Sequence, residues 1–287
     1  MTKSTFLHLR FPFSFYLMPV FLFGVAVSQP TEWIKVALVF FILHFLLYPA
    51  SNGYNSYFDQ DEGSIGGLEH PPKATKNLYR WSLVLDAVGI LLSLLISWQF
   101  SLMILIFGLV SKAYSHPSVR LKKKPIIGWL TVGIFQGYFT FLVTVYAVTL
   151  IPMDELMDWK WQCPALLSSM LLLGSYPMTQ VYQHQEDRER GDITISLKLG
   201  VLGTFYFTGL FFTLATFGFF FYFNRGFSLQ TGLLFIVFQF PVVLYFLNWY
   251  LKVRKDESAA DFRHTMRLNF VSALMLNLFF LIFALNH

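Results

Sequence analysis

Long apolar stretches alternate with short polar connections along the 287 residues of this chain. Roughly 18 or more consecutive residues with few charges are enough to cross a bilayer as a helix. Nine stretches approach this pattern, near residues 14–32, 33–51, 81–98, 99–115, 126–149, 163–182, 203–223, 229–251 and 266–285. The pattern predicts an all-α, polytopic membrane protein built as a bundle of about nine transmembrane helices.

The composition agrees with this class of protein. Hydrophobic residues make up 55% of the chain and charged residues 13%, whereas soluble domains carry about 25% charged residues. We expect one transmembrane helical domain over residues 1–287, without a separate soluble domain. Its longest polar loops, near 52–80 and 183–202, are expected to cap the bundle on the cytoplasmic side.

The basic residues indicate this orientation. If the N-terminus is cytoplasmic and the chain crosses nine times, Lys35, Lys160 and Arg225 lie on the outer side. The other Lys and Arg of the 21 in the chain lie on or near the inner side. This positive-inside bias predicts a multi-pass protein of a lipid bilayer, which we expect to be a bacterial cell membrane. The basic residues are scattered over four loops and form no single stripe, so the net charge of +5 does not indicate nucleic-acid binding.

The first polar loop starts with NSYFDQDEGSIGGLEHPPK, where a predicted helix leaves the membrane. Asn55, Asp59 and Glu62 are spaced i, i+4 and i+7, so they share one helix face. The same face extends back to Asn52, Tyr48 and His44. A polar stripe of this length must face protein or water, because contact with lipid is costly for polar groups.

The second polar loop contains QVYQHQEDRERGDITISLKLG. Gln183 and Asp187 are spaced i, i+4 with Glu186 and Arg190 beside them, and Gly191 is well placed to end that helix. Both loops are expected on the same side of the membrane, so their carboxylates and amides can meet over one cavity. Such hard oxygen ligands suit Mg²⁺, which usually takes one or two carboxylates and completes its shell with water and phosphate oxygens.

A third polar segment, YSHPSVRLKKKP, follows the fourth predicted span. Its Arg120 and Lys122 can bind an anionic phosphate, the arginine with a bidentate fork and the lysine as a point charge. Lys123 and Lys124 are better explained as a positive-inside anchor of the neighbouring span.

In these features the chain resembles the UbiA superfamily of intramembrane prenyltransferases. That family has nine transmembrane helices and two aspartate-rich motifs, usually written NDxxDxxxD and DxxxD, on the loops after helices two and six. The family also has four further features: a GxxT, a terminal LG, a YSxPxRLK-like segment after helix four and an RP…P pattern near the start. The matching residues here are Arg10, Pro12, Pro19, Asn55, Asp59, Tyr114, Ser115, Pro117, Arg120, Leu121, Lys122, Asp187, Gly191, Thr194, Leu199 and Gly200.

The first motif departs from the family pattern at two positions. Gly63 stands where the family has its second Asp, and Ser56 replaces the Asp after the first Asn. On a regular helix Asp61 would point elsewhere, whereas Glu62 keeps the helix face and is the better substitute.

Two further departures lie outside that stretch. Gln183 replaces the leading Asp of the second motif, and it brings an amide without charge. The RP that usually follows the first motif reads HPPK, with His70 or Lys73 as the possible substitute.

The resemblance implies transfer of an isoprenyl group from an isoprenyl diphosphate to an aromatic or lipophilic acceptor, in quinone or related lipid biosynthesis. It implies Mg²⁺ as the cofactor, with Asn55, Asp59, Glu62 and Asp187 as its ligands, and a catalytic role for Asp59, Asp187, Arg120 and Lys122. The residues expected to bind substrate are Asn55, Tyr48, Tyr54, Lys73, Tyr114, Gln183 and Arg188.

Three other functions fit parts of the pattern. A UbiA-type terpene cyclase would quench the cation within its own prenyl chain, and the altered motifs are compatible with such a change of chemistry. Gln183 favours a homologue without catalysis, and a transporter would also place polar residues at helix breaks. The catalytic hypothesis requires that Asp59 and Asp187 line one cavity. If they lie apart, the non-catalytic hypothesis is favoured.

Overall fold

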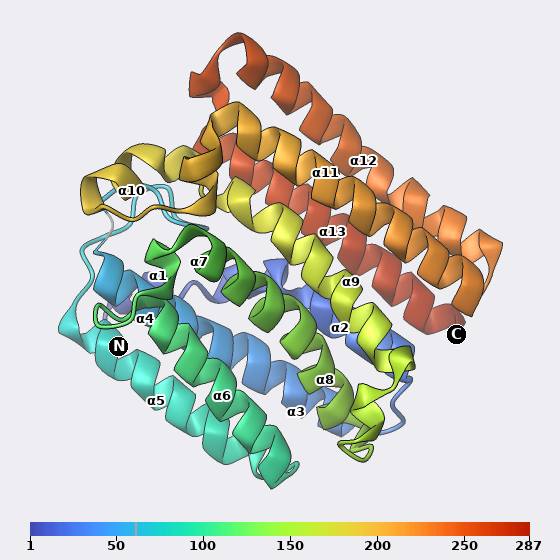
Figure 1. Cartoon of the computed structure of the whole chain (residues 1–287). Coiled ribbons are helices and arrows are strands. Elements are labelled where there is room, and N and C mark those ends of the chain that lie inside the picture. Colours follow the sequence, from blue (N-terminus) through green and yellow to red (C-terminus); the bar gives the residue numbers. More distant parts are fainter. Residues whose placement is uncertain (61) are drawn as a thin grey trace.

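The computed structural model describes residues 1–60 and 62–287, and this part of the chain is built from helices (Figure 1). The one β-bridge in these residues joins Ile65 and Leu68. The α-helices are α1 (Lys3–Leu9), α2 (Met18–Ser28), α3 (Trp33–Phe41), α4 (Tyr48–Asp59), α5 (Lys76–Ser93), α6 (Trp98–Ser115), α7 (Pro125–Val132), α8 (Thr140–Thr149), α9 (Trp159–Ser175), α10 (His184–Arg190), α11 (Ile195–Gly226), α12 (Leu229–Lys255) and α13 (Phe262–Asn286).

The apolar segments confirm a membrane protein but not the predicted number of spans. By length and composition, five helical segments of the described residues can cross a membrane: Trp33–Asp59, Pro125–Thr149, Ile195–Gly226, Leu229–Lys255 and Phe262–Asn286. The bent pair Lys3–Tyr16 and Met18–Ser28 would make a sixth. Each of the nine predicted stretches overlaps a helix, yet α5 carries Lys76, Arg80 and Asp86 within 18 residues, and the count of nine is not confirmed.

Small residues let α9 cross the α7–α8 span closely. A π-helical segment, Gly133–Phe139, joins α7 to α8. A Cβ added at Gly137 would lie 2.5 Å from the Cα of Ser169 in α9, and the Ser169 hydroxyl donates to the Gly133 carbonyl at 2.8 Å. Lipid provides no hydrophobic driving force for helix association. Helices in a membrane therefore associate through close packing of this kind and through hydrogen bonds between them.

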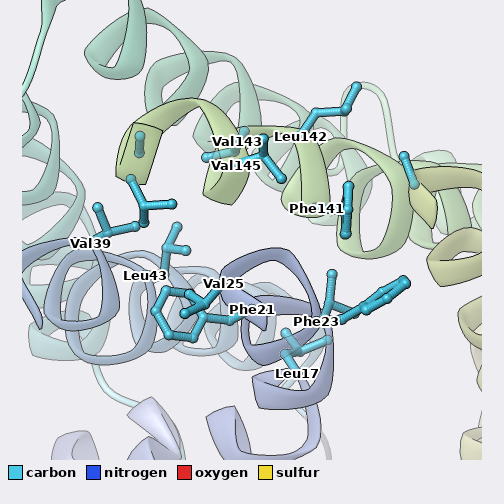
Figure 2. Close-up of a cluster of buried hydrophobic side chains, with 14 of the residues drawn as sticks. Leu17, Phe21, Phe23, Val25, Val39, Leu43, Phe141, Leu142, Val143 and Val145 are labelled. Atoms are coloured by element: carbon cyan, nitrogen blue, oxygen red, sulfur yellow. The ribbon is translucent and has the colours of Figure 1, made fainter. Parts of the chain in front are cut away.

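An aromatic core joins the N-terminal helices to the C-terminal ones. Phe23 of α2 stacks on Phe280 of α13 with ring centroids 4.7 Å apart and contacts Phe219 of α11 at 5.2 Å. Beside it, α2, α3, the π-helical segment Ile42–Leu47 and α8 contribute side chains drawn in Figure 2, among them Phe21, Val25, Val39, Leu43, Phe141 and Val145. Because these contacts link the two ends of the sequence, they fix the helices around the centre of the bundle.

The polar segments gather at one end of the bundle. Figure 1 shows α1, α10 and the connection between α4 and α5 together at this end, with the C-terminus at the other. The side-chain amide of Gln29 donates to the backbone oxygen of His287 at 2.6 Å, so the C-terminus lies beside the α2–α3 connection. The polar loops near 52–80 and 183–202 belong to this end, and their capping of the cytoplasmic side stays a prediction.

A buried ion pair lies between α5 and α6, and the sequence analysis assigned it no role. Lys112 of α6 pairs with Asp86 of α5, whose side chain is 9% exposed. The Lys112 ammonium also lies over the Tyr54 ring of α4, 5.4 Å from its centroid. One lysine therefore contacts three helices below the polar end of the bundle.

We predict that Lys112→Met destabilises the protein by about 3 kcal/mol, because it leaves the Asp86 carboxylate buried without its cation. The double variant Asp86→Leu/Lys112→Met should recover most of that loss, since it removes both charges. The measurement is unfolding of the purified protein in detergent, with Lys76→Met at an exposed position of α5 as the control. Equal stability of the single variant and the parent chain would show that the pair contributes nothing to the fold.

Candidate active site

The first motif lies where α4 ends. Gln60 adopts a left-handed backbone with φ of 50°, and this stops the helix after Asp59. Asn55 and Asp59 therefore share a helix face as predicted, but Glu62 does not continue it. The expectation that Glu62 keeps this face is wrong, because the chain has already left the helix. Asp61 lies outside the described residues.

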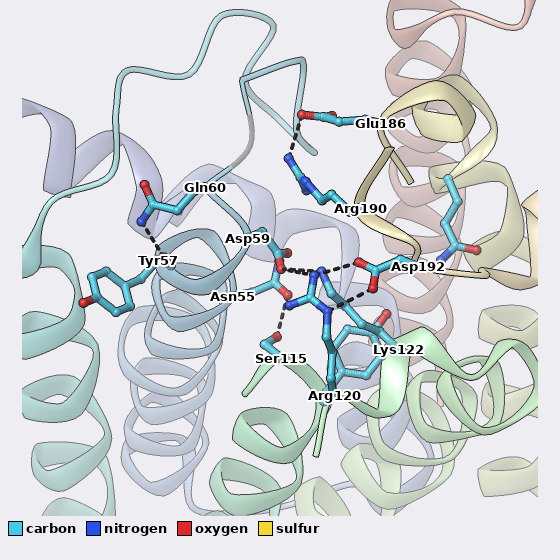
Figure 3. Close-up of polar contacts among 12 residues, drawn as sticks. Asn55, Tyr57, Asp59, Gln60, Ser115, Arg120, Lys122, Glu186, Arg190 and Asp192 are labelled. Atoms are coloured by element: carbon cyan, nitrogen blue, oxygen red, sulfur yellow. Dashed lines mark hydrogen bonds and ion pairs between the residues drawn. The ribbon is translucent and has the colours of Figure 1, made fainter. Parts of the chain in front are cut away.

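The Asp59 carboxylate is held by two cations from the α6–α7 connection (Figure 3). Its Oδ1 atom pairs with the Lys122 ammonium and lies 3.6 Å from Nη2 of Arg120. The Asp59 side chain is only 3% exposed. Next to it, the Ser115 hydroxyl donates to Oδ1 of Asn55 at 2.5 Å. The first and third polar segments of the sequence thus meet directly.

Arg120 reaches this position through an unusual backbone conformation. Its φ is 42°, in the left-handed region that costs a residue with a side chain about 1 kcal/mol. Its guanidinium donates from Nε and Nη2 to the two oxygens of Asp192, at 2.9 and 2.7 Å. A bidentate arginine–carboxylate pair is strong and directional, and it offsets the local strain. Arg120 therefore lies fixed between Asp192 and Asp59.

The second motif forms the short helix α10. Gly191 ends it with φ of 68°, as the sequence predicted. Gln183 precedes its first residue, and Asp187 lies within it. The Thr194 hydroxyl donates to Oδ2 of Asp187 at 3.0 Å.

The two aspartates near Gly191 differ in their ionisation. Burial raises the pKa of Asp187 to about 6, although the bond from Thr194 and the charge of Lys122 act in the other direction. Burial alone would also raise the pKa of Asp192, but the hydrogen bonds from Arg120 and the nearby cations lower it below its ordinary value. Asp192 is therefore firmly ionised, whereas Asp187 is the carboxylate that gains most from an additional cation.

The chain between α4 and α5 is tied to α10 through its backbone. Oε1 of Glu186 accepts the amide hydrogens of Glu62 and Gly63, both at 3.1 Å. The Gln183 amide nitrogen donates to the Ser64 carbonyl at 3.0 Å. A carboxylate at position 183 could not make this last bond, because it has no hydrogen to donate. The amide at this departure from the motif thus has a structural use.

These segments enclose a polar cavity of about 240 Å³. Six predicted site residues line it: Asn55, Asp59, Tyr114, Lys122, Gln183 and Asp187. Arg120 lies behind them, in contact with Asp59 and Asp192. Asp59 and Asp187 therefore line one cavity, which is the condition that the catalytic hypothesis required.

The other predicted residues lie elsewhere. Tyr54 packs against Tyr79 and Lys112, on the side of α4 that faces α5. Lys73 and Arg188 are exposed at the surface, and Glu62 contributes its backbone to the contact with Glu186. None of these four is among the described residues that line the polar cavity. Whether a residue lines the cavity depends on its burial and on the direction of its helix, and the charge pattern of a loop indicates neither.

Several cavity residues were not assigned to the site from the sequence. Arg10 lines the cavity and donates from its guanidinium to the carbonyls of Gly66 and Asn52, at 3.1 and 3.3 Å. Arg190 and Asp192 also line it. The spacing of Arg190 from Asp187, i to i+3, puts both on one face and would have favoured it over Arg188. Arg10 was matched only as part of the RP…P pattern, and no spacing marks Asp192; both come to the site through tertiary folding.

A second cavity, of about 270 Å³, adjoins the polar one. The two share lining residues, including Phe13, Asn52, Gln136 and Tyr176. Tyr48 lines this second cavity together with many apolar side chains, among them Leu17, Val20, Phe23, Phe212, Phe246 and Phe280. The polar cavity thus forms an ionic end, and the adjoining second cavity forms an apolar interior. Together they suit a ligand with an anionic head and a hydrocarbon tail.

The donors present fit a hard divalent cation with few protein ligands. Asp59 and Asp187 bring carboxylate oxygens to the polar cavity, and Asn55 and Gln183 bring amide oxygens. Within the described residues, no group of three or more His, Cys, Asp or Glu side chains forms a metal-binding cluster. Such a sparse set matches Mg²⁺, which completes its shell with water and substrate phosphates.

The profile of the UbiA prenyltransferase family matches residues 16–273. The comparison with curated proteins found no match.

Three solved structures illustrate the shared fold. A digeranylgeranylglyceryl phosphate synthase is 19% identical, with 99% of each chain covered and a TM-score of 0.64. A UbiA homolog from Archaeoglobus fulgidus, bound to DMAPP and Mg²⁺, is 14% identical over 98% of this chain and 99% of its own, with a TM-score of 0.66. The apo UbiA homolog from Aeropyrum pernix K1 is 14% identical over 95% and 98%, with a TM-score of 0.72.

We predict that Gln183→Asp loosens the chain between α4 and α5. The variant loses the donor to the Ser64 carbonyl and brings a carboxylate near that oxygen, at a cost of about 1 kcal/mol. Hydrogen exchange of the backbone amides in residues 62–69 should become about fivefold faster. Gln185→Asp, on the exposed side of α10, is the matched control. Unchanged exchange in Gln183→Asp would show that the Gln183–Ser64 bond does not hold this segment.

Proposed function

The chain belongs to the UbiA prenyltransferase family, and we propose that it transfers an isoprenyl group from an isoprenyl diphosphate to an aromatic or lipophilic acceptor with the help of Mg²⁺. The observation that carries the proposal is the shared cavity of Asp59, Asp187 and Lys122, which adjoins an apolar cavity. The homolog from Archaeoglobus fulgidus has been solved with DMAPP and with GPP, each together with Mg²⁺, and this supports the class of donor substrate.

The proposed reaction breaks the bond between C1 of the isoprenyl group and the diphosphate oxygen. The electron pair of that bond leaves with the diphosphate, and the allylic carbon then bonds to the acceptor, which loses a proton. Mg²⁺, when bound by Asn55, Asp59 and Asp187, would neutralise the diphosphate and make it a better leaving group. Lys122, Arg10 and Arg190 line the same cavity and compensate the remaining negative charge.

The apolar cavity suits the other half of the donor. Its aromatic side chains, Phe13, Phe23, Phe212, Phe246 and Phe280 among them, exclude water from an isoprenyl chain. Aromatic faces also attract a cation through their quadrupole, so they favour the allylic cation over its hydration. The acceptor enters from the membrane or the cytoplasmic side and is selected by the shape of this cavity.

We also propose that the polar cavity opens toward the cytoplasm. Lys35, Lys160 and Arg225 lie at the opposite end of the bundle, and the remaining basic residues concentrate at the site end or close to it. The positive-inside rule assigns the basic end to the cytoplasm. Isoprenyl diphosphates would thus reach the site from the cytoplasm or from the inner leaflet.

We predict diphosphate release that depends on Mg²⁺ and stops with EDTA. The purified protein would be assayed in detergent with dimethylallyl, geranyl, farnesyl and geranylgeranyl diphosphates, with and without quinone precursors. Release only when an acceptor is present supports the transferase. Release without acceptor, together with a cyclic hydrocarbon or alcohol, would identify a cyclase instead. Neither binding nor release with any of the four donors would contradict the enzyme hypothesis.

We predict that Asp59→Asn and Asp187→Asn each lower turnover by about a hundredfold or more, because each removes a charged ligand of the cation that stabilises the leaving group. The asparagine keeps the side-chain shape, so expression and thermal stability check that the fold is intact. Asp154→Asn, exposed at the far end of the bundle, should leave turnover unchanged. Full activity in either site variant would exclude the proposed cation site.

A further inference from the structure

Three carboxylates of the described residues line the polar cavity, and they differ in their partners. Asp59 pairs with Lys122 and Arg120, and Asp192 pairs with Arg120 through two hydrogen bonds. Among the described residues, Asp187 makes no ion pair, and its carboxylate accepts a hydrogen bond from the Thr194 hydroxyl. In this part of the chain, Asp187 is therefore the cavity carboxylate that still needs a cation, whereas Asp59 and Asp192 already have cationic partners.

On the side of the cavity next to α10, the acidic and amide side chains of the described residues are already engaged. Glu186 is engaged by the amides of Glu62 and Gly63 and by Arg190 at 2.7 Å. A Cβ added at Gly63 would lie 3.0 Å from Oε2 of Glu186, so a carboxylate there would face another carboxylate. The Gln183 amide nitrogen is bound to the Ser64 carbonyl. Glu186 and Gln183 thus bind the backbone between α4 and α5, and this use competes with binding of a second cation.

Lys122 holds its charge in a fixed place. Its side chain is 12% exposed, lines the cavity and pairs with Asp59. Its backbone is packed against the start of α7, where a Cβ added at Gly128 would lie 3.0 Å from the Cα of Lys122. The neighbouring Arg120 is fixed by Asp192 and by its left-handed backbone. A cation held in this way needs little rearrangement when an anion binds.

From these contacts we propose that the site binds its diphosphate with a single divalent cation, held by Asp187 together with Asn55 and Asp59, and that Lys122 supplies the positive charge that a second divalent cation would bring. The inference rests on the proposed function, since it concerns how the same diphosphate is held. Lys122, which pairs with Asp59, would contact the diphosphate next to this cation. Charge balance then comes partly from the protein itself, and one divalent cation accompanies each bound diphosphate.

The test counts bound metal and does not depend on turnover. The detergent-purified chain is equilibrated with Mn²⁺ and the thiolo analogue of geranyl diphosphate, whose leaving group departs very slowly. Free Mn²⁺ is measured by electron paramagnetic resonance and bound analogue by radiolabel. We expect one Mn²⁺ for each bound analogue in the parent chain and in Lys122→Arg. Lys122→Met should either take up a second Mn²⁺ or bind the analogue at least tenfold more weakly.

The control is Lys123→Met, which removes an exposed charge from the adjacent position and should behave like the parent chain. Two Mn²⁺ for each analogue in the parent chain would overturn the inference while leaving the proposed function intact. Lys122→Met with one Mn²⁺ and unchanged affinity would overturn it as well. A parent chain that does not bind the analogue at all would overturn the proposed function, and this inference with it.

Discussion

The pairing of Arg120 with Asp192 and Asp59 connects the three segments on which the site depends. Asp59 ends α4, Arg120 belongs to the α6–α7 connection, and Asp192 follows α10. These segments are far apart in the sequence and carry few apolar side chains that could hold them together. A bidentate pair of low exposure fixes their distance and direction at once. The positions of Lys122, Asn55 and Asp187 around the cavity follow from this contact.

Below that contact, the bundle separates polar from apolar chemistry along its length. Charges gather at the end with α1 and α10, and the adjoining cavity is closed by aromatic side chains from α2, α11, α12 and α13. The Asp86–Lys112 pair is the exception among these helices, and it lies close to α4 through Tyr54. Asp86 and Lys112 are thus charged groups inside the bundle that neutralise each other, as a membrane environment requires.

The sequence predicted the helical membrane fold and the meeting of two polar motifs, because hydropathy and i, i+4 spacing are local properties. It also predicted the end of α10 at Gly191. It placed Glu62 on a helix face, because nothing in the residue type of Gln60 indicates a left-handed backbone. Arg10 and Asp192 were not assigned to the site, since their approach to the cavity depends on tertiary contacts. The number of spans was not confirmed, because α5, α6 and α9 are not among the described segments that can cross a membrane by length and composition, and α5 carries three charges.

The contact between Gly63 and Glu186 has a consequence for the substitutions that this chain tolerates. An acidic residue introduced at position 63 would meet the Glu186 carboxylate, and an acidic residue at 183 would lose the bond to Ser64. Neither acidic residue of the family pattern can be introduced alone without a penalty in the backbone between α4 and α5. Positions 63, 183 and 186 therefore depend on one another through this segment.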